Sequence, residues 1–356
     1  MSFLILILGI DTVASLLVVA TALPASGSTR WWVRMWDFPR AQLAGLLAAA
    51  LVAVAATQGW SAWPLVAALG LGLGWQLWRI LPYTPVAGPE MQLAPPGSGT
   101  VTLLAANVLM ENRAHDRVRA LVAEVDPDVL LLMETDRTWI EALEPVLAGY
   151  PTVVRTPRDD CYGMVFATRL ATTSARTVRL SRDETPALLA ELADPEGRPF
   201  RFIGLHPQPP VPGQDTDERD AQILYAARFA RATAMPLVVM GDFNDVAWSR
   251  NSHRFKRVGG YLDPRVGRGL FASFDARRWW FRCPIDQIFV TGEVAVESFR
   301  LGPKIGSDHF PLIARISLDP ALAAGLNRTP EQLPPAEAAR IDARVEAWRR
   351  QLGPQD

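Results

Sequence analysis

Three long apolar stretches fill most of the first 81 residues of this chain. Residues 3–23 contain one acidic residue, Asp11, and residues 41–57 and 62–78 contain no charged residue. Each stretch is close to the roughly 17 to 25 residues that a helix needs to cross a bilayer. A cleaved signal peptide would explain the first stretch alone, but no basic residue precedes it and two further stretches follow. The pattern predicts a membrane anchor of three transmembrane helices in residues 1–81.

The segment between the first two stretches has the composition of a membrane surface. Residues 30–38 contain three tryptophans and two arginines, which suit the headgroup layer. Arg30, Arg34 and Arg40 make this the more basic of the two connecting loops. By the positive-inside rule this loop, and everything after the third helix, would lie in the cytoplasm.

The chain changes character after the anchor. Residues 82–99 carry five prolines and three glycines and are predicted to form an extended tether. A folded domain is expected over residues 100–318, and residues 319–356 form a polar tail with a helix between about 335 and 352. Cys161 and Cys283 fit either one disulfide or two buried thiols.

The expected domain alternates strands and helices. Short apolar runs bounded by polar or turn residues predict six strands, at 101–105, 129–133, 164–167, 200–205, 237–240 and 285–290. Helical periodicity appears at 117–125 and at 217–233. This order is typical of an α/β domain with a two-layered sheet core and helices outside.

Polar side chains with catalytic potential follow these apolar runs. They are Asn107, Glu134, His206, Asp242, Asn244, Asp286, Asp308 and His309. Carboxylate and amide oxygens suit Mg²⁺ or Mn²⁺, whereas a zinc site would use more histidines or cysteines. A metal that neutralises a phosphate, a base that activates water and donors for the growing charge together hydrolyse a phosphoester. The set therefore predicts a metal-dependent phosphoesterase.

Six short motifs around these residues resemble the endonuclease/exonuclease/phosphatase superfamily, in a membrane-anchored bacterial branch. In chain order they are Ala106-Asn107-Val108, Leu132-Met133-Glu134-Thr135-Asp136, Gly204-Leu205-His206-Pro207, Gly241-Asp242-Phe243-Asn244, Pro284-Ile285-Asp286-Gln287 and Gly306-Ser307-Asp308-His309-Phe310-Pro311. The resemblance covers residues 100–318. It implies a four-layered α/β sandwich, in which two packed mixed sheets are flanked by helices.

The resemblance also implies a role for each residue. Glu134 would be the main Mg²⁺ (or Mn²⁺) ligand, with Asn107 nearby and Asp308 available to a second or migrating metal. Asp242 would activate the attacking water and Asn244 would hold the phosphate. His309, polarised by Asp286, and His206 would contact phosphoryl oxygens. The family's acid two positions after the first asparagine is replaced by Leu109, which argues against DNA repair activity.

The substrate class rests on composition and on the anchor. Residues 250–282 carry nine basic residues against two acids, interleaved with aromatic side chains. This combination suits nucleic acid and an anionic lipid surface equally well. A tether of under twenty residues keeps the domain close to the bilayer, so we expect membrane lipids as partners and a lipid headgroup as substrate. No protein partner can be inferred from the sequence.

Two alternatives and the membrane side complete these expectations. The domain could be a DNA or RNA endonuclease or exonuclease, or an inactive scaffold that binds anionic partners, although the complete set of site residues argues against the scaffold. We expect a multi-pass protein of the cell (inner) membrane. Relatives that combine three amino-terminal helices with a similar domain tend to carry basic residues at the extreme N-terminus and between the second and third helices. That arrangement would put the domain outside the cytoplasm, and we favour this side over the one given by the arginine count.

Overall fold

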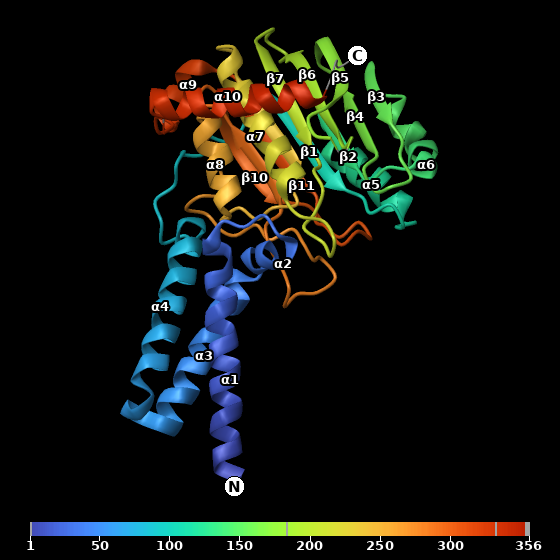
Figure 1. Cartoon of the computed structure of the whole chain (residues 1–356). Helices are drawn as coiled ribbons and strands as arrows, with labels where there is room; N and C mark the ends of the chain where they lie inside the picture. Colours follow the sequence, from blue (N-terminus) through green and yellow to red (C-terminus); the bar gives the residue numbers. More distant parts are fainter. Residues whose placement is uncertain (1, 183, 332, 353–356) are drawn as a thin grey trace.

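The chain is organised as an α/β domain from which a group of long helices projects (Figure 1). The structure is a computed structural model and describes residues 2–182, 184–331 and 333–352. The long helices are α1 (Ser2–Ala22), α3 (Arg40–Gln58) and α4 (Trp63–Ile80), and we call them the stalk. A short helix, α2 (Trp31–Arg34), and the 3-10 turn η2 (Met35–Asp37) connect α1 to α3.

The stalk helices pack on one another through a narrow apolar seam. Ala14, Leu47 and Leu69 are fully buried where α1, α3 and α4 meet. Most other apolar side chains of the stalk face outward, and Leu71 is 77% exposed. Two continuous helical segments, Ser2–Ser26 and Arg40–Tyr83, are long and apolar enough to cross a membrane. The second contains both α3 and α4, so the count of three transmembrane helices stays a prediction.

A buried ion cluster closes the end of the stalk next to the domain. Asp37 in η2 pairs with Arg34 (2.8 Å) and with Arg40, and all three side chains are buried. Arg40 also donates from Nη1 to Gln76 Oε1 of α4 (2.8 Å), and Gln76 Nε2 donates to Thr21 Oγ1 of α1 (3.1 Å). Burying charges is tolerated only when they are paired and hydrogen-bonded, so this network fixes how the three helices meet.

The domain is built on two mixed sheets. The first has the order β10-β11-β1-β2-β4-β3, with β1 (Val101–Asn107), β2 (Val129–Met133), β3 (Thr152–Thr156), β4 (Met164–Thr168), β10 (Ala295–Leu301) and β11 (Leu312–Ser317). The second has the order β5-β6-β7-β8-β9, with β5 (Ala171–Arg179), β6 (Pro186–Ala193), β7 (Pro199–Leu205), β8 (Leu237–Asp242) and β9 (Asp286–Val290). Within these sheets β1 runs parallel to β2, and β7 runs parallel to β8.

Alternating side chains on the central strands explain the layers. In β8, Val238 and Met240 enter the core between the sheets, whereas Leu237 and Val239 face the outer helices. Because successive side chains point to opposite faces, a strand covered on both sides is apolar at every position. Helices α5 (His115–Val125) and α6 (Arg137–Leu147) cover the first sheet, and α7 (Asp217–Ala232), α8 (Arg250–Gly259) and α10 (Pro335–Leu352) cover the second. The predicted four-layered α/β sandwich is confirmed.

The segments that flank the domain lie against it. Residues 84–99 follow the turn η4 (Leu81–Tyr83) and contain no helix or strand, and Ala94 N donates to Val296 O (2.8 Å). Gln92 N donates to Leu326 O (2.8 Å) at the end of α9 (Pro320–Leu326). The segment predicted to form an extended tether is thus hydrogen-bonded to the domain over part of its length. Both cysteines are free thiols in the structure.

Gly241 gives the most direct test of this packing. It lies beside Leu205 with φ +145°, and an added Cβ would lie 2.1 Å from the Leu205 carbonyl oxygen. We predict that Gly241→Ala destabilises the domain by roughly 2 kcal/mol or more, equivalent to a fall in Tm of roughly 4–8 °C. Thermal unfolding of the full chain measures this. Gly197→Ala, at φ +80° with open space around the added Cβ, is the control and should lose less; equal losses would contradict the account.

Candidate active site

The eight predicted site residues come from strand ends, and seven of them meet at one edge of the paired sheets. Asn107 ends β1 and Glu134 follows β2, while Asp242 ends β8 and His206 follows β7. In each sheet the two strands that carry these residues are parallel, so their carboxyl ends lie at the same edge. Asp286 begins β9, which runs antiparallel to β8 and pairs Asp286 with Asp242.

Asn107 connects the two sheets. Its Nδ2 donates to Glu134 Oε1 (2.7 Å) and to Asp242 Oδ2 (3.1 Å), and its Oδ1 accepts from Leu109 N (3.0 Å). Glu134 also accepts a hydrogen bond at Oε2 from Met110 N (3.2 Å). These bonds hold Glu134 although its backbone has φ +62°, an uncommon conformation for a residue with a side chain.

Asp242 is the centre of the cluster. Its Oδ1 accepts a hydrogen bond from Asn244 N (2.9 Å). Its Oδ2 lies 3.7 Å from His206 Nε2 and 3.6 Å from His309 Nε2, both longer than a hydrogen bond. A carboxylate placed between two imidazoles in this way can accept a proton while the imidazoles contact the same reacting group.

His309 and Asp286 form a buried pair. His309 Nδ1 lies 2.7 Å from Asp286 Oδ2, and both residues are at most 5% exposed. Burial by itself would lower the pKa of His309, but the carboxylates of Asp286 and Asp242 outweigh it and raise the pKa to about 10. His309 is therefore a cation near neutral pH, oriented by Asp286.

Asn244 and Asp308 lie at the rim of the site. Asn244 has φ +46°, and its Nδ2 donates to Pro207 O (2.9 Å), next to His206. Asp308 accepts a hydrogen bond at Oδ2 from Arg277 Nη2 (2.9 Å). In the part of the chain that the structure describes, no hydrogen bond joins Asp308 to Glu134 or Asn107. It is the one predicted site residue whose carboxylate the structure does not bring into this network.

Several neighbours of the site were not singled out from the sequence. The Phe274 ring lies 5.0 Å from the His309 ring, and the Tyr162 ring lies 5.4 Å from His206. Arg219 is fully buried and donates from Nη1 to Asn244 O (2.9 Å). Phe274 lies in the basic and aromatic stretch, and Tyr162 lies just before the predicted strand 164–167. The sequence therefore offered a signal by which both residues could have been found. Arg219 lies in a polar helix, where nothing in the sequence distinguishes it from its charged neighbours.

The donor set fits a hard divalent cation. Burial raises the pKa of Glu134 above its ordinary value, even though His206 and two hydrogen bonds oppose this. Asp242 adds a second negative charge close by, and a cation would offset both effects. Ligand atoms of Asp242, Asp286 and His309 also lie within 4.8 Å of one another. In this second group, however, His309 Nδ1 and Asp286 Oδ2 are already hydrogen-bonded to each other. Glu134 and Asn107 are thus the residues best suited to hold the metal.

The raised pKa of His309 gives a pH test of this geometry. Because the folded pKa of about 10 exceeds the ordinary value near 6.5, its contribution to stability is complete below about pH 6.5 and is lost as pH rises toward 10. Asp286→Asn removes the main interaction that raises this pKa. We predict that the difference in Tm between wild type and Asp286→Asn, measured in metal-free buffer, shrinks as pH rises through this window. A difference that stays constant with pH would contradict the assignment.

Similar folds occur among solved structures. A TDP2 structure from D. rerio, complexed with single strand DNA product, matches with a TM-score of 0.51 and 18% identity, covering 61% of this chain and 98% of that one. An endonuclease/exonuclease/phosphatase from Bacteroides vulgatus matches with a TM-score of 0.51 and 20% identity, covering 62% and 99%. The human nocturnin catalytic domain with bound sulfate matches with a TM-score of 0.50 and 18% identity, covering 65% and 99%. At these identities the likeness shows the fold.

Sequence comparison identifies the family. No curated protein sequence gives a significant match to the chain. The model of the endonuclease/exonuclease/phosphatase family matches residues 104–309, which is more than half of the chain and contains all eight site residues. Enzymes of this family are hydrolases of phosphoester bonds and typically depend on a divalent metal. The prediction of a hydrolase acting on ester bonds is confirmed, and the chain belongs to the endonuclease/exonuclease/phosphatase family.

Proposed function

We propose that this protein is a membrane-tethered, Mg²⁺-dependent phosphoesterase that hydrolyses a phosphodiester or phosphomonoester in a lipid headgroup. The observation that carries the proposal is the position of the catalytic edge, because its loops rest on the end of the stalk. The loop after Asn244 makes the direct contacts: Trp248 Nε1 donates to Asp37 O (2.7 Å), and Tyr83 Oη donates to Ala247 O (2.6 Å). If the stalk spans a bilayer, these contacts place the site at its surface.

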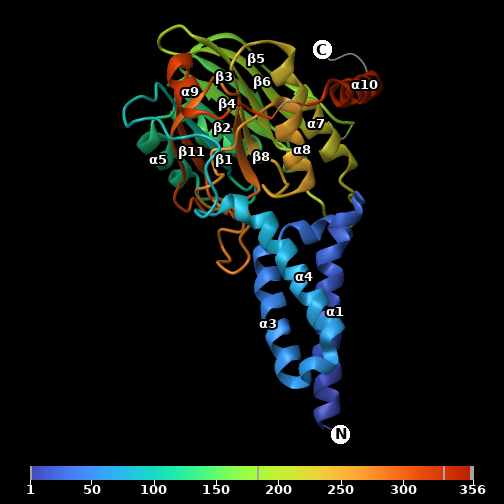
Figure 2. The same cartoon turned by 90° about the vertical axis from the view of Figure 1, so that its left-hand side faces the viewer.

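A second loop brings aromatic side chains to the same place. The bridge between Phe274 and Cys283 closes what we call the tryptophan loop, residues 274–283. Its tip carries Trp279 and Trp280, which are 82% and 59% exposed. At the start of α3, Gln42 Nε2 donates to Trp280 O (3.2 Å). In Figures 1 and 2 this orange loop extends from the domain on the side of the stalk. Tryptophans at that level suit the membrane interface.

The tryptophan loop also connects the interface to the catalytic histidine. Phe274, at its base, contacts the His309 ring, and Phe310 N donates to Ser273 O (2.9 Å). Asp286 N in turn donates to Ser273 Oγ (3.2 Å). The residues that hold the histidine pair are therefore contiguous with the residues that would lie in the headgroup layer. This continuity supports a substrate taken from the membrane.

The site residues supply the chemistry of phosphoester hydrolysis. Mg²⁺ held by Glu134 and Asn107 would neutralise negative charge on the phosphate. Asp242 accepts the proton of the attacking water, and its hydrogen bond from Asn244 N orients it. The cationic His309, together with His206, stabilises charge that develops on the phosphoryl oxygens. Asn244 lies at the rim, where its side chain contacts the bound phosphate.

The basic stretch of the sequence supports lipid over nucleic acid. Arg265 is buried against Asp263, Lys256 pairs with Glu90, and Arg257 pairs with Glu331. These three charges are held in internal or local ion pairs and are not free to contact a nucleic-acid backbone. Four consecutive exposed residues of the stretch, 277–280, lie at the tip of the tryptophan loop, which is next to the stalk.

We further propose that the domain lies outside the cytoplasm. Two of the three arginines that favoured the cytoplasm, Arg34 and Arg40, are buried and share the one carboxylate of Asp37, so they do not stand free in the connecting loop. A C-terminal reporter fusion that is active only in the cytoplasm would overturn this proposal.

The proposed chemistry is tested by Asp242→Asn in the purified full chain. With Mg²⁺, wild type should hydrolyse one class in a panel of phosphoinositide and sphingomyelin vesicles, abasic duplex DNA and single-stranded DNA, and we expect a lipid. Because Asp242 is the base, Asp242→Asn should lower kcat by roughly 100-fold or more. Turnover of DNA alone would reject the lipid proposal. Metal binding without any turnover would favour an inactive scaffold.

The orientation of the site is tested at the tryptophan loop. Trp279→Ser combined with Trp280→Ser should lower kcat/KM on vesicle substrate by roughly tenfold, because apolar contact with the interface is lost. Hydrolysis of a soluble phosphoester with the same headgroup should not change. Trp60→Ser is the control, since Trp60 is 87% exposed in the turn between α3 and α4, away from the domain. An equal loss on both substrates would contradict the interfacial role.

A further inference from the structure

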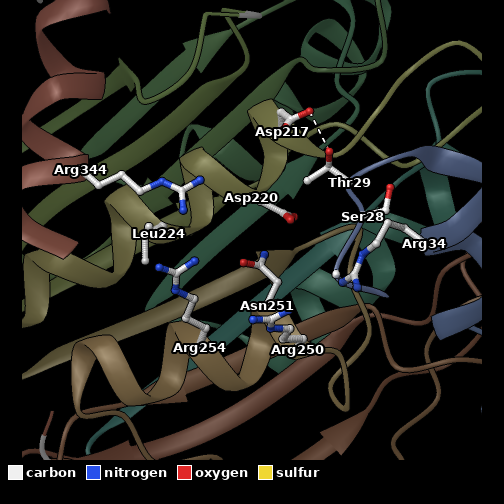
Figure 3. A pocket seen from close by; sticks show the side chains of 11 residues that line it. Ser28, Thr29, Arg34, Asp217, Asp220, Leu224, Arg250, Asn251, Arg254 and Arg344 are labelled. Carbon is white, nitrogen blue, oxygen red and sulfur yellow. Dashed lines mark hydrogen bonds between the residues drawn. The ribbon is translucent and has the colours of Figure 1, made fainter. Parts of the chain in front are cut away.

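A polar cavity lies where the stalk meets the domain, apart from the catalytic residues. It has a volume of about 230 Å³ and is lined by the segment 27–29 that follows α1, by the first turns of α7 and by α8 and α10. Four arginines line it, namely Arg34, Arg250, Arg254 and Arg344. Figure 3 shows that Arg254 and Arg344 extend toward each other from α8 and α10, on either side of Leu224.

The cavity carries excess positive charge. Two aspartates, Asp217 and Asp220, face the four arginines, so the formal charge of the lining is 4 − 2 = +2. Asp220 is also paired with Arg219 of its own helix (2.9 Å), while Asp217 accepts a hydrogen bond from Thr29 Oγ1 (3.0 Å). Arg34 is likewise paired, with Asp37, so the lining residues without an ion-pair partner in the described chain are Asp217 and three arginines, and the excess stays at 3 − 1 = +2.

Three of the four arginines have no ion-pair partner among the described residues. Arg34 pairs with Asp37, but Arg250, Arg254 and Arg344 form no ion pair in the described part of the chain. Burial lowers the pKa of Arg254, and the like charges of Arg344 and Arg250 lower it further, although the carboxylates of Glu337 and Asp220 partly oppose this. Like charges gathered from separate helices oppose folding unless something compensates them.

A buried amide donor adds an independent observation. Asn251 is 8% exposed, and its Nδ2 has no hydrogen-bond partner in the structure. Figure 3 shows this side chain among the cavity residues, between Arg254 and Asp220. Leaving a buried donor unsatisfied costs about 1–3 kcal/mol, so such groups ordinarily have a ligand or water partner. Asn251 and the arginines together present donors to one anion.

We propose that this cavity is a second, non-catalytic binding site for a phosphate group. Guanidinium groups from two helices can each donate to different oxygens of a tetrahedral anion, whereas a carboxylate offers only two oxygens. The phosphate belongs to a lipid headgroup or to a soluble phosphate compound. The first source rests on the proposed membrane anchor, because segment 27–29 directly follows the apolar helix α1 and its terminal turn η1 (Leu23–Ser26). The proposal also gives the C-terminal helix α10 a role, through Arg344.

The test measures phosphate binding to the full chain in neutral detergent by titration calorimetry. Divalent metals are chelated, because Glu134, Asp242 and Asp286 then repel phosphate from the catalytic edge. The probes are inorganic phosphate and a soluble short-chain phosphatidic acid. Wild type should bind at one saturable site, and Arg254→Gln combined with Arg344→Gln should weaken binding about tenfold or more. Arg340→Gln, one turn earlier on the exposed side of α10, is the matched control and should bind as wild type does.

Each outcome decides the proposal. Binding of both probes with similar affinity, lost in the double variant, supports a soluble phosphate ligand; binding of the lipid about tenfold tighter supports a headgroup. No saturable binding, or equal binding by wild type and the double variant, overturns the site. If the double variant fails to fold, the exposed single variant Arg344→Gln carries the comparison. Because no turnover is measured, this result is independent of whether the catalytic proposal holds.

Discussion

The hydrogen bonds of the Asn107 amide join the two sheets at the edge where the chemistry would take place. From β1 in the first sheet, Asn107 Nδ2 reaches Glu134 of the same sheet and Asp242 of the second. The two carboxylates repel each other in a buried setting, and a shared donor allows them to lie close together. The site therefore depends on the register of two separate sheets, and a shift of either would separate the proposed metal ligands from the proposed base.

The same edge carries the contacts to the stalk, which links location to chemistry. The loop between β8 and α8 contains both Asn244 and Trp248, and the Trp248 indole donates to Asp37 O in the buried ion cluster. The tryptophan loop makes the corresponding connection from the His309 side. Two loops that shape the site are thus held by the base of the apolar helices.

Strands and motifs were predictable from the sequence, but their partners were not. The six predicted strands correspond to β1, β2, β4, β7, β8 and β9, because strands buried on both faces have unbroken apolar runs. The edge strand β5 was missed since most of its side chains are exposed, and the basic helix α8 was missed since Phe255 and Val258 are among its few buried apolar residues. The link from Arg277 to Asp308 joins residues 31 positions apart, and no local pattern indicates it. Sequence order likewise could not show that Arg254 and Arg344 line one cavity.

The most direct measurement of the central claim compares hydrolysis of one headgroup in two settings. The full chain is reconstituted into vesicles that contain the lipid substrate, and release of the headgroup is compared with hydrolysis of substrate carried by separate, protein-free vesicles. The account predicts that lipid in the protein's own bilayer is hydrolysed much faster, because the catalytic edge is held at that surface. Equal rates on both vesicle populations, or hydrolysis of only soluble substrates, would contradict it.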